Sequence, residues 1–205
     1  MAKIFTVFGK AGAARLLDPL GRRLLRLGVT PDTVTVLGTL GVLVGTFGFA
    51  ARGKLLAAVV IVTLSGLADL LDGAMARARG RTSRFGAFLD STMDRVADGA
   101  VFASLAFWLG RTDRPAAAAA ALLCLVAGQI VSYAKARAEG LGMTCNVGIA
   151  ERPERLIIIG VGALLAVFTT PYALDVALWL LAVLSVVTIG QRMVHVYRQD
   201  GRTSE

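Results

Sequence analysis

The stretch that decides the fold is DLLDGAMARARGRTSRFGAFLDSTMD, which covers residues 69–94. It carries four aspartates, Asp69, Asp72, Asp90 and Asp94, in a chain of 205 residues that is 56% hydrophobic and only 18% charged. The first two are three residues apart and the last two are four apart, so each pair lies on one face of a helix. Long apolar runs continue on both sides of the stretch, so these acidic faces belong to helices of a membrane protein.

The apolar runs predict an all-α integral membrane protein with six transmembrane helices. A mean hydropathy of +0.68 is typical of a membrane protein and not of a water-soluble globule. The acidic stretch ends the second span and begins the third, on antiparallel neighbours. We expect the spans at 31–52, 54–79, 86–110, 115–139, 153–170 and 173–197.

The net charge of +8 is explained by the membrane and not by nucleic acid, because lysine and arginine collect between the apolar runs. Alternate connections place 17 of these residues on the side of the N-terminus and four on the other side. The positive-inside rule then puts both termini and the acidic stretch on the cytoplasmic side of the plasma membrane. Only two cysteines are present, which excludes a disulfide scaffold and a four-cysteine zinc site.

Residues 1–29 are expected to form a juxtamembrane amphipathic helix, and residues 30–205 the six-helix domain. One face of that first helix carries leucines and the rest carries arginines: Leu17, Leu20, Leu24 and Leu27 against Arg15, Arg22 and Arg26. Such a helix lies in the headgroup layer and favours anionic lipid. A helix that packs on the aqueous side is the alternative.

Four carboxylates at one site need cations between them, because like charges in a poorly solvated place repel each other. We therefore predict a metal site at the four aspartates with one or two magnesium ions, or manganese. Two such ions would also suit a phosphoryl transfer, because they can stabilise the charge on the attacking and leaving oxygens. The alternative is a set of interhelical ion pairs with the nearby arginines, which are Arg77, Arg79, Arg81, Arg84 and Arg95.

The acidic stretch resembles the signature of the CDP-alcohol phosphotransferase family at every fixed position. The matching residues are Asp69-x-x-Asp72-Gly73-x-x-Ala76-Arg77, eight further residues, and Gly86-x-x-x-Asp90-x-x-x-Asp94. The resemblance implies a six-helix membrane enzyme, often a homodimer, that moves a substituted phosphate from a CDP-linked donor to an alcohol and releases CMP. It implies that the aspartates hold the metal and that Asp94 is also the general base. It further implies that the CDP part is cradled by Gly73, Ala76, Arg77 and Gly86.

A second, shorter match opens the first span. Thr30-Pro31-Asp32-x-x-Thr35-x-x-Gly38 is similar to a Thr-Pro-Asn stretch of many family members, with Asp32 in place of the commoner asparagine. The similarity implies that Asp32 and Thr35 contribute to the site for CDP-diacylglycerol. Helix initiation by Thr30 and Pro31 explains those two residues without a ligand.

Polar and cationic residues on three later helices point to an acceptor that itself carries phosphate. They are Ser132, Lys135, Arg155 and Arg192, with Arg137 and Arg152 nearby. The cytoplasmic excess of basic residues explains some of them without a ligand. The stretches 132–137 and 151–155 resemble the phosphatidylinositol phosphate synthases of actinobacteria, a branch of the family, which implies inositol phosphate as the acceptor.

We therefore expect a phosphatidyltransferase that uses CDP-diacylglycerol and inositol phosphate and makes phosphatidylinositol phosphate and CMP. Asp94 would take the proton of the inositol hydroxyl, whose oxygen attacks the phosphorus attached to diacylglycerol. Within the family, the alternative is a phosphatidylglycerophosphate synthase that uses glycerol 3-phosphate. The alternative of another class is a cation transporter with a buried aspartate path, which requires carboxylates near mid-membrane and not near one boundary.

Overall fold

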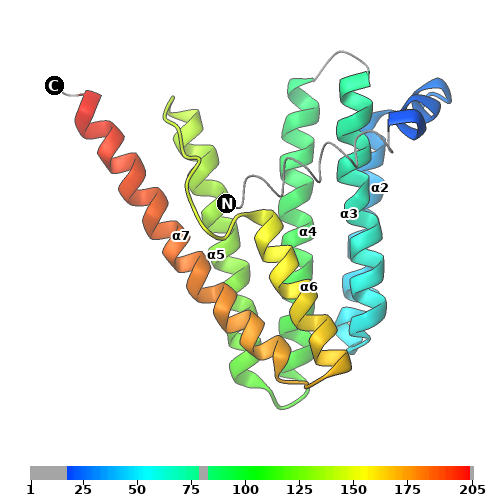
Figure 1. The fold of residues 1–205 in the computed structure, drawn as a ribbon, viewed down its shortest axis with the longest axis vertical. Helices are drawn as coiled ribbons and strands as arrows, with labels where there is room; N and C mark the ends of the chain where they lie inside the picture. The colour runs from blue at the N-terminus through cyan, green and yellow to red at the C-terminus, as the bar shows by residue number, and fades with distance from the viewer. Residues whose placement is uncertain (1–17, 79–82, 204–205) are drawn as a thin grey trace.

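Helices that run up and down make up the protein in the computed structural model, which describes residues 18–78 and 83–203, without the side chains of 201–203. Within these residues every regular element is helical, so the all-α prediction is confirmed. A helix of residues 18–26 comes first. The elements that follow are α2 (Pro31–Gly48), the short 3-10 helix η1 (Ala50–Arg52), α3 (Leu55–Ala78), α4 (Arg84–Gly110), α5 (Pro115–Gly140), α6 (Arg152–Phe168) and α7 (Ala173–Thr203) (Figure 1).

Local sequence explains where these helices begin. The Thr30 hydroxyl accepts a hydrogen bond from the backbone N–H of Thr33 at 3.2 Å, which caps α2. Ser83 caps α4 in the same way, at 2.7 Å from the nitrogen of Gly86. Prolines occupy the first turns of α2, α5 and α6, where their missing N–H costs no hydrogen bond. The helices therefore start within two residues of the predicted spans.

Four helical segments in the described part of the chain are long and apolar enough to cross a membrane: Pro31–Arg52, Leu55–Ala78, Pro115–Gly140 and Ala173–Asp200. The first half of α4 is too charged to qualify, and α6 has only 17 residues. Both nevertheless run alongside the other helices of the bundle (Figure 1). The fold is that of an all-helical membrane protein, and the number of six spans stays a prediction.

Small residues bring α2 and α3 unusually close. A Cβ atom added at Gly38 would lie 2.7 Å from the Cβ of Ala68, and one at Gly45 would lie 3.0 Å from a methyl group of Ile61. A side chain at Gly38 would therefore force the two helices to shift, and one at Gly45 would require Ile61 to move slightly, as is common where membrane helices touch through small residues. This contact holds the start of α2 against the end of α3, where the acidic stretch begins.

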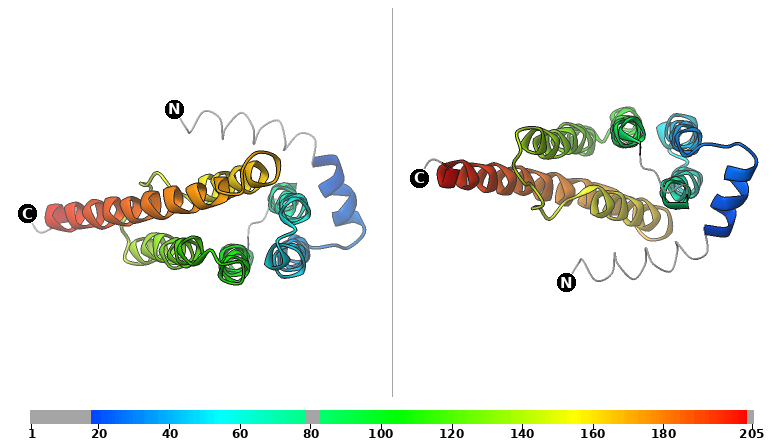
Figure 2. Two further views of the ribbon diagram at one scale, coloured as in Figure 1. Left: turned by 90° about the horizontal axis from the view of Figure 1, so that it is seen from below. Right: turned by 90° about the horizontal axis from the view of Figure 1, so that it is seen from above.

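The helix of residues 18–26 lies across the bundle beside α2 and α3 instead of along it (Figure 2). Gly21 is buried there, and a Cβ at this position would lie 3.1 Å from Cγ of Met75. Leu20 and Leu27 are 46% and 78% exposed. Leu17 and Arg15 lie outside the described residues, so the predicted amphipathic helix of residues 1–29 is seen only in part. Its place at a membrane surface stays a prediction.

Candidate active site

The predicted carboxylates gather at one end of the bundle, which we call the aspartate end; there α3 stops at Ala78 and α4 starts at Arg84 (Figure 1). Asp69 lies nine residues before the end of α3, and Asp94 lies ten residues after the start of α4. At a rise of about 1.5 Å per residue, both lie roughly 14 Å below the helix ends. At this depth Asp69 and Asp94 are half-buried, whereas of the two aspartates nearer the helix ends Asp72 is buried and Asp90 is exposed.

One guanidinium joins two of these carboxylates. Nη1 of Arg152, in the first turn of α6, donates a hydrogen bond to Oδ2 of Asp69 at 2.8 Å. The same nitrogen is 2.8 Å from Oδ1 of Asp94. The two oxygens are thus separated by no more than twice that distance. Helices α3, α4 and α6 therefore converge on one guanidinium group.

A buried ion pair lies next to this point. Asp98, one turn after Asp94 on α4, is 4% exposed and accepts a hydrogen bond from the guanidinium of Arg155, which is 1% exposed. The other oxygen of Asp98 accepts one from Nε of Arg152 at 3.3 Å. Two aspartates on one face of α4 thus hold two arginines of α6.

The predicted metal site has donors of the right chemistry, because hard carboxylate oxygens are the ligands that magnesium and manganese prefer. Asp69 and Asp90 both lie close enough to Asp72 and to Asp94 for their negative charges to repel each other. The four aspartates are therefore electrostatic neighbours. In the described residues, no three side chains of the metal-binding types already stand in coordinating positions. The four carboxylates have the right chemistry for a divalent metal and lie near one another. Asp69 and Asp94 contact the guanidinium of Arg152.

Ion pairs between helices are present, but their arginines are not the ones that lie near the aspartates in the sequence. Arg95 is 3.7 Å from Asp94 on its own helix, and the arginines that pair with these aspartates from another helix are Arg152 and Arg155 of α6. Arg79 and Arg81 lie outside the described residues. The sequence assigns no role to Asp98, although its four-residue spacing from Asp94 is visible there, and it places Arg152 only near the predicted acceptor residues and not beside the aspartates.

The two motifs at which the resemblance places the nucleotide come together at the aspartate end. Thr35 of α2 donates a hydrogen bond to Oδ2 of Asp72 at 2.6 Å. A Cβ atom at Gly86 would lie 3.2 Å from Oδ1 of Asp32, so the starts of α2 and α4 touch. Arg77 is exposed and Gly73 and Ala76 are half-buried beside it on α3.

The predicted acceptor residues fall into two groups. Lys135 is 37% exposed on its side chain and lies 4.0 Å from Glu139 on α5, and Ser132 is half-buried. Arg155 is buried against Gly128, which lies one turn before Ser132 on the same helix. Arg192 is 3% exposed and donates hydrogen bonds to the carbonyl oxygens of Val131 and Val147. Two of the four are accessible, and the two arginines already hold protein groups.

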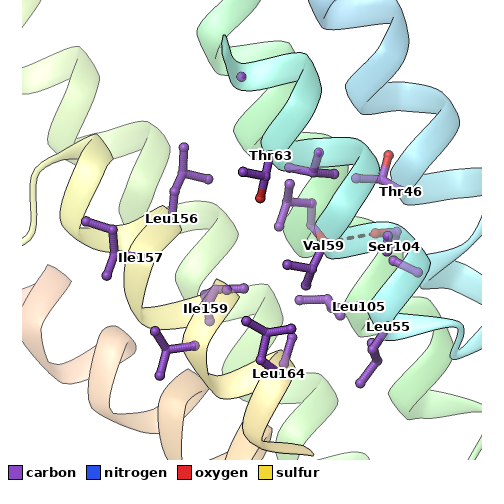
Figure 3. Close-up of a pocket in the computed structure, with 18 residues that line it drawn as sticks. Thr46, Leu55, Val59, Thr63, Ser104, Leu105, Leu156, Ile157, Ile159 and Leu164 are labelled. Atoms are coloured by element: carbon purple, nitrogen blue, oxygen red, sulfur yellow. Dashed lines mark hydrogen bonds between the residues drawn. The ribbon is translucent and has the colours of Figure 1, made fainter. Parts of the chain in front are cut away.

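An apolar pocket of about 420 Å³ lies directly below the carboxylates, between α3, α4 and α6. Figure 3 shows Leu156 and Ile159 of α6 on one side of it and Val59 and Thr63 of α3 on the other. The lining reaches Gly66, three residues before Asp69, and Leu156, next to Arg155. An apolar chain in this pocket would therefore end beside the charged site.

Comparison with known proteins gives a consistent result. The profile of the CDP-alcohol phosphatidyltransferase family matches residues 28–190. The chain is 49% identical over 199 residues to the phosphatidylinositol phosphate synthase of Mycobacterium marinum, covering 95% of this chain and 85% of that protein. It is 48% identical over 201 residues to the protein of the same name from Streptomyces avermitilis, covering 94% and 82%.

Solved structures agree with the sequence comparison. The phosphatidylinositol phosphate synthase of Mycobacterium tuberculosis with CDP-DAG bound superimposes with a TM-score of 0.85 at 49% identity, covering 89% of this chain and 94% of that one. The same enzyme in complex with manganese and citrate gives a TM-score of 0.84 at 49% identity, covering 88% of each chain.

Proposed function

The chain belongs to the CDP-alcohol phosphatidyltransferase family, and on this premise we propose that it transfers the phosphatidyl group of CDP-diacylglycerol to inositol phosphate. The products are phosphatidylinositol phosphate and CMP. The observation that carries the proposal is the convergence of Asp69 and Asp94 on one cation, directly above an apolar pocket. This arrangement suits a substrate with a charged head and an apolar tail. Relatives of the same name, one of them solved with CDP-DAG bound, support the choice of substrates.

The donor lipid is proposed to enter sideways from the bilayer. Its acyl part occupies the pocket between α3, α4 and α6, whose walls are almost entirely apolar. Its nucleotide part lies higher, where Arg77 and the backbone at Gly73 and Gly86 accept phosphate groups and the nucleotide. Ala76, Asp32 and Thr35 complete this part, and Thr35 holds the carboxylate of Asp72 in place.

The chemistry is proposed to take place between the two parts. A divalent metal, magnesium or manganese, held by Asp69, Asp72, Asp90 and Asp94, would neutralise the charge that develops on the phosphoryl group. The acceptor hydroxyl oxygen forms a bond to the phosphorus attached to diacylglycerol, and the bond from that phosphorus to the oxygen of CMP breaks. Asp94 takes the proton of the hydroxyl, and its side chain is 18% exposed, so a hydroxyl can reach it.

The acceptor is proposed to bind through its phosphate beside α5. Ser132 and Lys135 are four and seven residues after Gly128, so they continue the helix face that contacts Arg155. Lys135 supplies an accessible positive charge there. Arg155 and Arg192 would support this site from the interior of the bundle. Their guanidinium groups are buried, and they donate hydrogen bonds to Asp98 and to two backbone carbonyls, respectively.

We further propose six membrane spans with both termini on the cytoplasmic side of the plasma membrane. The packing of α4 and α6 among the four apolar helices and the excess of basic residues on one side support this arrangement. The helix of residues 18–26 would lie at the membrane surface, since it runs across the bundle. The proposed homodimer rests on the family resemblance and is testable by cross-linking in the membrane.

The deciding experiment is a CMP-release assay with purified protein, CDP-diacylglycerol, magnesium and a panel of alcohols. Inositol phosphate is expected to support turnover, and free inositol is expected to fail. Asp69→Asn serves as the inactive control, because it removes one predicted ligand while keeping the side-chain shape. If glycerol 3-phosphate supports turnover and inositol phosphate does not, glycerol 3-phosphate is the acceptor instead. If CMP is released with no preference among the alcohols, the proposed acceptor site is refuted.

A further inference from the structure

We propose that Arg152 is a built-in competitor of the divalent metal for Asp69 and Asp94. The inference rests on the proposed metal site and deepens it, since it assigns to a residue outside the aspartate motif the control of metal affinity. Its basis is a contact pattern and not a sequence pattern. One nitrogen of this arginine lies 2.8 Å from an oxygen of each aspartate.

The geometry makes the competition direct. A metal that bound both Asp69 and Asp94 would need the same space between the two oxygens that Nη1 of Arg152 occupies. Both cations are attracted by the same negative charge, but only one can fill the space at a time. The metal must therefore displace one hydrogen bond and one close ion pair before it gains its ligands.

Arg152 differs in this respect from the other arginine near Asp94. Arg95 is 3.7 Å from Oδ2 of Asp94, its side chain is 34% exposed, and among the described residues it forms no ion pair with a second aspartate. It adds positive charge to the neighbourhood without standing between the two carboxylates. The pair of arginines thus separates direct competition from a general electrostatic effect.

Asp98 explains how Arg152 could yield its place without leaving the site. It accepts a hydrogen bond from Nε of Arg152 at 3.3 Å, whereas Asp69 and Asp94 contact Nη1, and it is itself held by the buried Arg155. The planar guanidinium moves as one unit, so rotation about the carbon–carbon bonds of the side chain would carry Nη1 away from the two aspartates while Asp98 remains nearby as a counter-charge. A displaced Nη1 stays within the charged site, where a substrate phosphate can accept from it.

The test is manganese affinity measured by calorimetry on the full-length protein in detergent. Arg152→Gln should bind manganese at least about tenfold more tightly than the wild type, because the metal no longer breaks a charge-assisted contact. Arg95→Gln, the matched control, should tighten binding by less than about threefold, as expected for a partly exposed charge. Arg152→Lys should fall between wild type and Arg152→Gln, because a single ammonium cannot hold Asp98 and both metal oxygens together.

A second readout does not depend on the affinity fit. The melting temperature with manganese minus that in EDTA should be larger for Arg152→Gln than for the wild type, since tighter binding stabilises the folded state more. Equal affinities for wild type and Arg152→Gln, or an equal gain in Arg95→Gln, would overturn the competition. If the wild type binds manganese no better than Asp69→Asn does, the metal site itself is wrong, and the proposed function fails with it.

Discussion

Asparagine in place of Asp98 is expected to destabilise the protein far more than its position outside the predicted motif suggests. Asp98 is 4% exposed and is the ion-pair partner of Arg155, which is 1% exposed. The substitution keeps the shape of the side chain but leaves a buried guanidinium without its counter-charge. Breaking a buried pair from one side costs about 3–5 kcal/mol, and the amide oxygen that remains places this variant near the lower limit.

The expected loss can be measured as a fall in melting temperature in detergent. For a chain of this length each kcal/mol corresponds to about 2–4 °C, so Asp98→Asn should melt roughly 6–12 °C below the wild type. Asp175→Asn is the matched control at the opposite end of the bundle, where the side chains of Asp175 and Arg114 are 24% and 20% exposed. A more solvated pair contributes about 1 kcal/mol or less, so the control should lose no more than about 4 °C.

A double substitution separates charge from packing. Asp98→Leu combined with Arg155→Met removes both charges and should recover most of the stability that Asp98→Asn loses, because apolar side chains replace buried ion pairs well. Equal melting temperatures for Asp98→Asn and Asp175→Asn would refute the larger contribution of the buried pair. A double variant that melts no higher than Asp98→Asn would refute the role of the unpaired charge.

Three further outcomes concern activity. Asp94→Asn should lower kcat by about 10²–10⁴ while CDP-diacylglycerol still binds, because the amide cannot take the proton; loss of turnover and donor binding together would make Asp94 mainly a metal ligand. Lys135→Ala should raise the KM for inositol phosphate by about tenfold and leave that for CDP-diacylglycerol unchanged, so a change in the donor KM alone would move Lys135 to the donor site. Gly160→Leu should raise the KM for long-chain CDP-diacylglycerol and spare a short-chain analogue, because Gly160 lines the apolar pocket and has open space beside it. Equal effects on both lipids would show that the pocket does not hold the acyl chains.

The sequence predicts the elements of this fold well because the relevant signals are local. Thr30, Ser83 and the prolines at helix starts act on their own first turns, and the apolar runs mark the positions of the helices, with α3 and α4 continuing into the acidic stretch. The differences lie at the ends. Helix α4 begins at Arg84, two residues before the predicted span, because Ser83 caps it, and α7 extends to Thr203 beyond the predicted end at 197.

The candidate site could be predicted within each helix but not between helices. Spacing places Asp90, Asp94 and Asp98 on one face of α4, yet it does not tell which side chains of α6 meet them. That depends on how far the segment between α5 and α6 returns into the bundle before Arg152 begins the helix. For the same reason the sequence predicts Arg155 and Arg192 near the acceptor phosphate without showing that in the fold they also contact Asp98 and backbone carbonyls.

The position of the pocket also decides between the enzyme and the transporter that the acidic stretch alone allowed. A cation path across the membrane needs polar groups above and below its carboxylates, because an unpartnered ion in an apolar space is strongly disfavoured. Beneath Asp69 the space between α3, α4 and α6 is lined by residues such as Val62, Leu105 and Ile159. Of the three hydroxyls in that lining, on Thr46, Thr63 and Ser104, those of Thr46 and Ser104 already donate to carbonyl oxygens of their own helices. Polar access is therefore one-sided and the other side is shaped for hydrocarbon, which is the arrangement that a lipid-linked phosphate requires and an ion path does not.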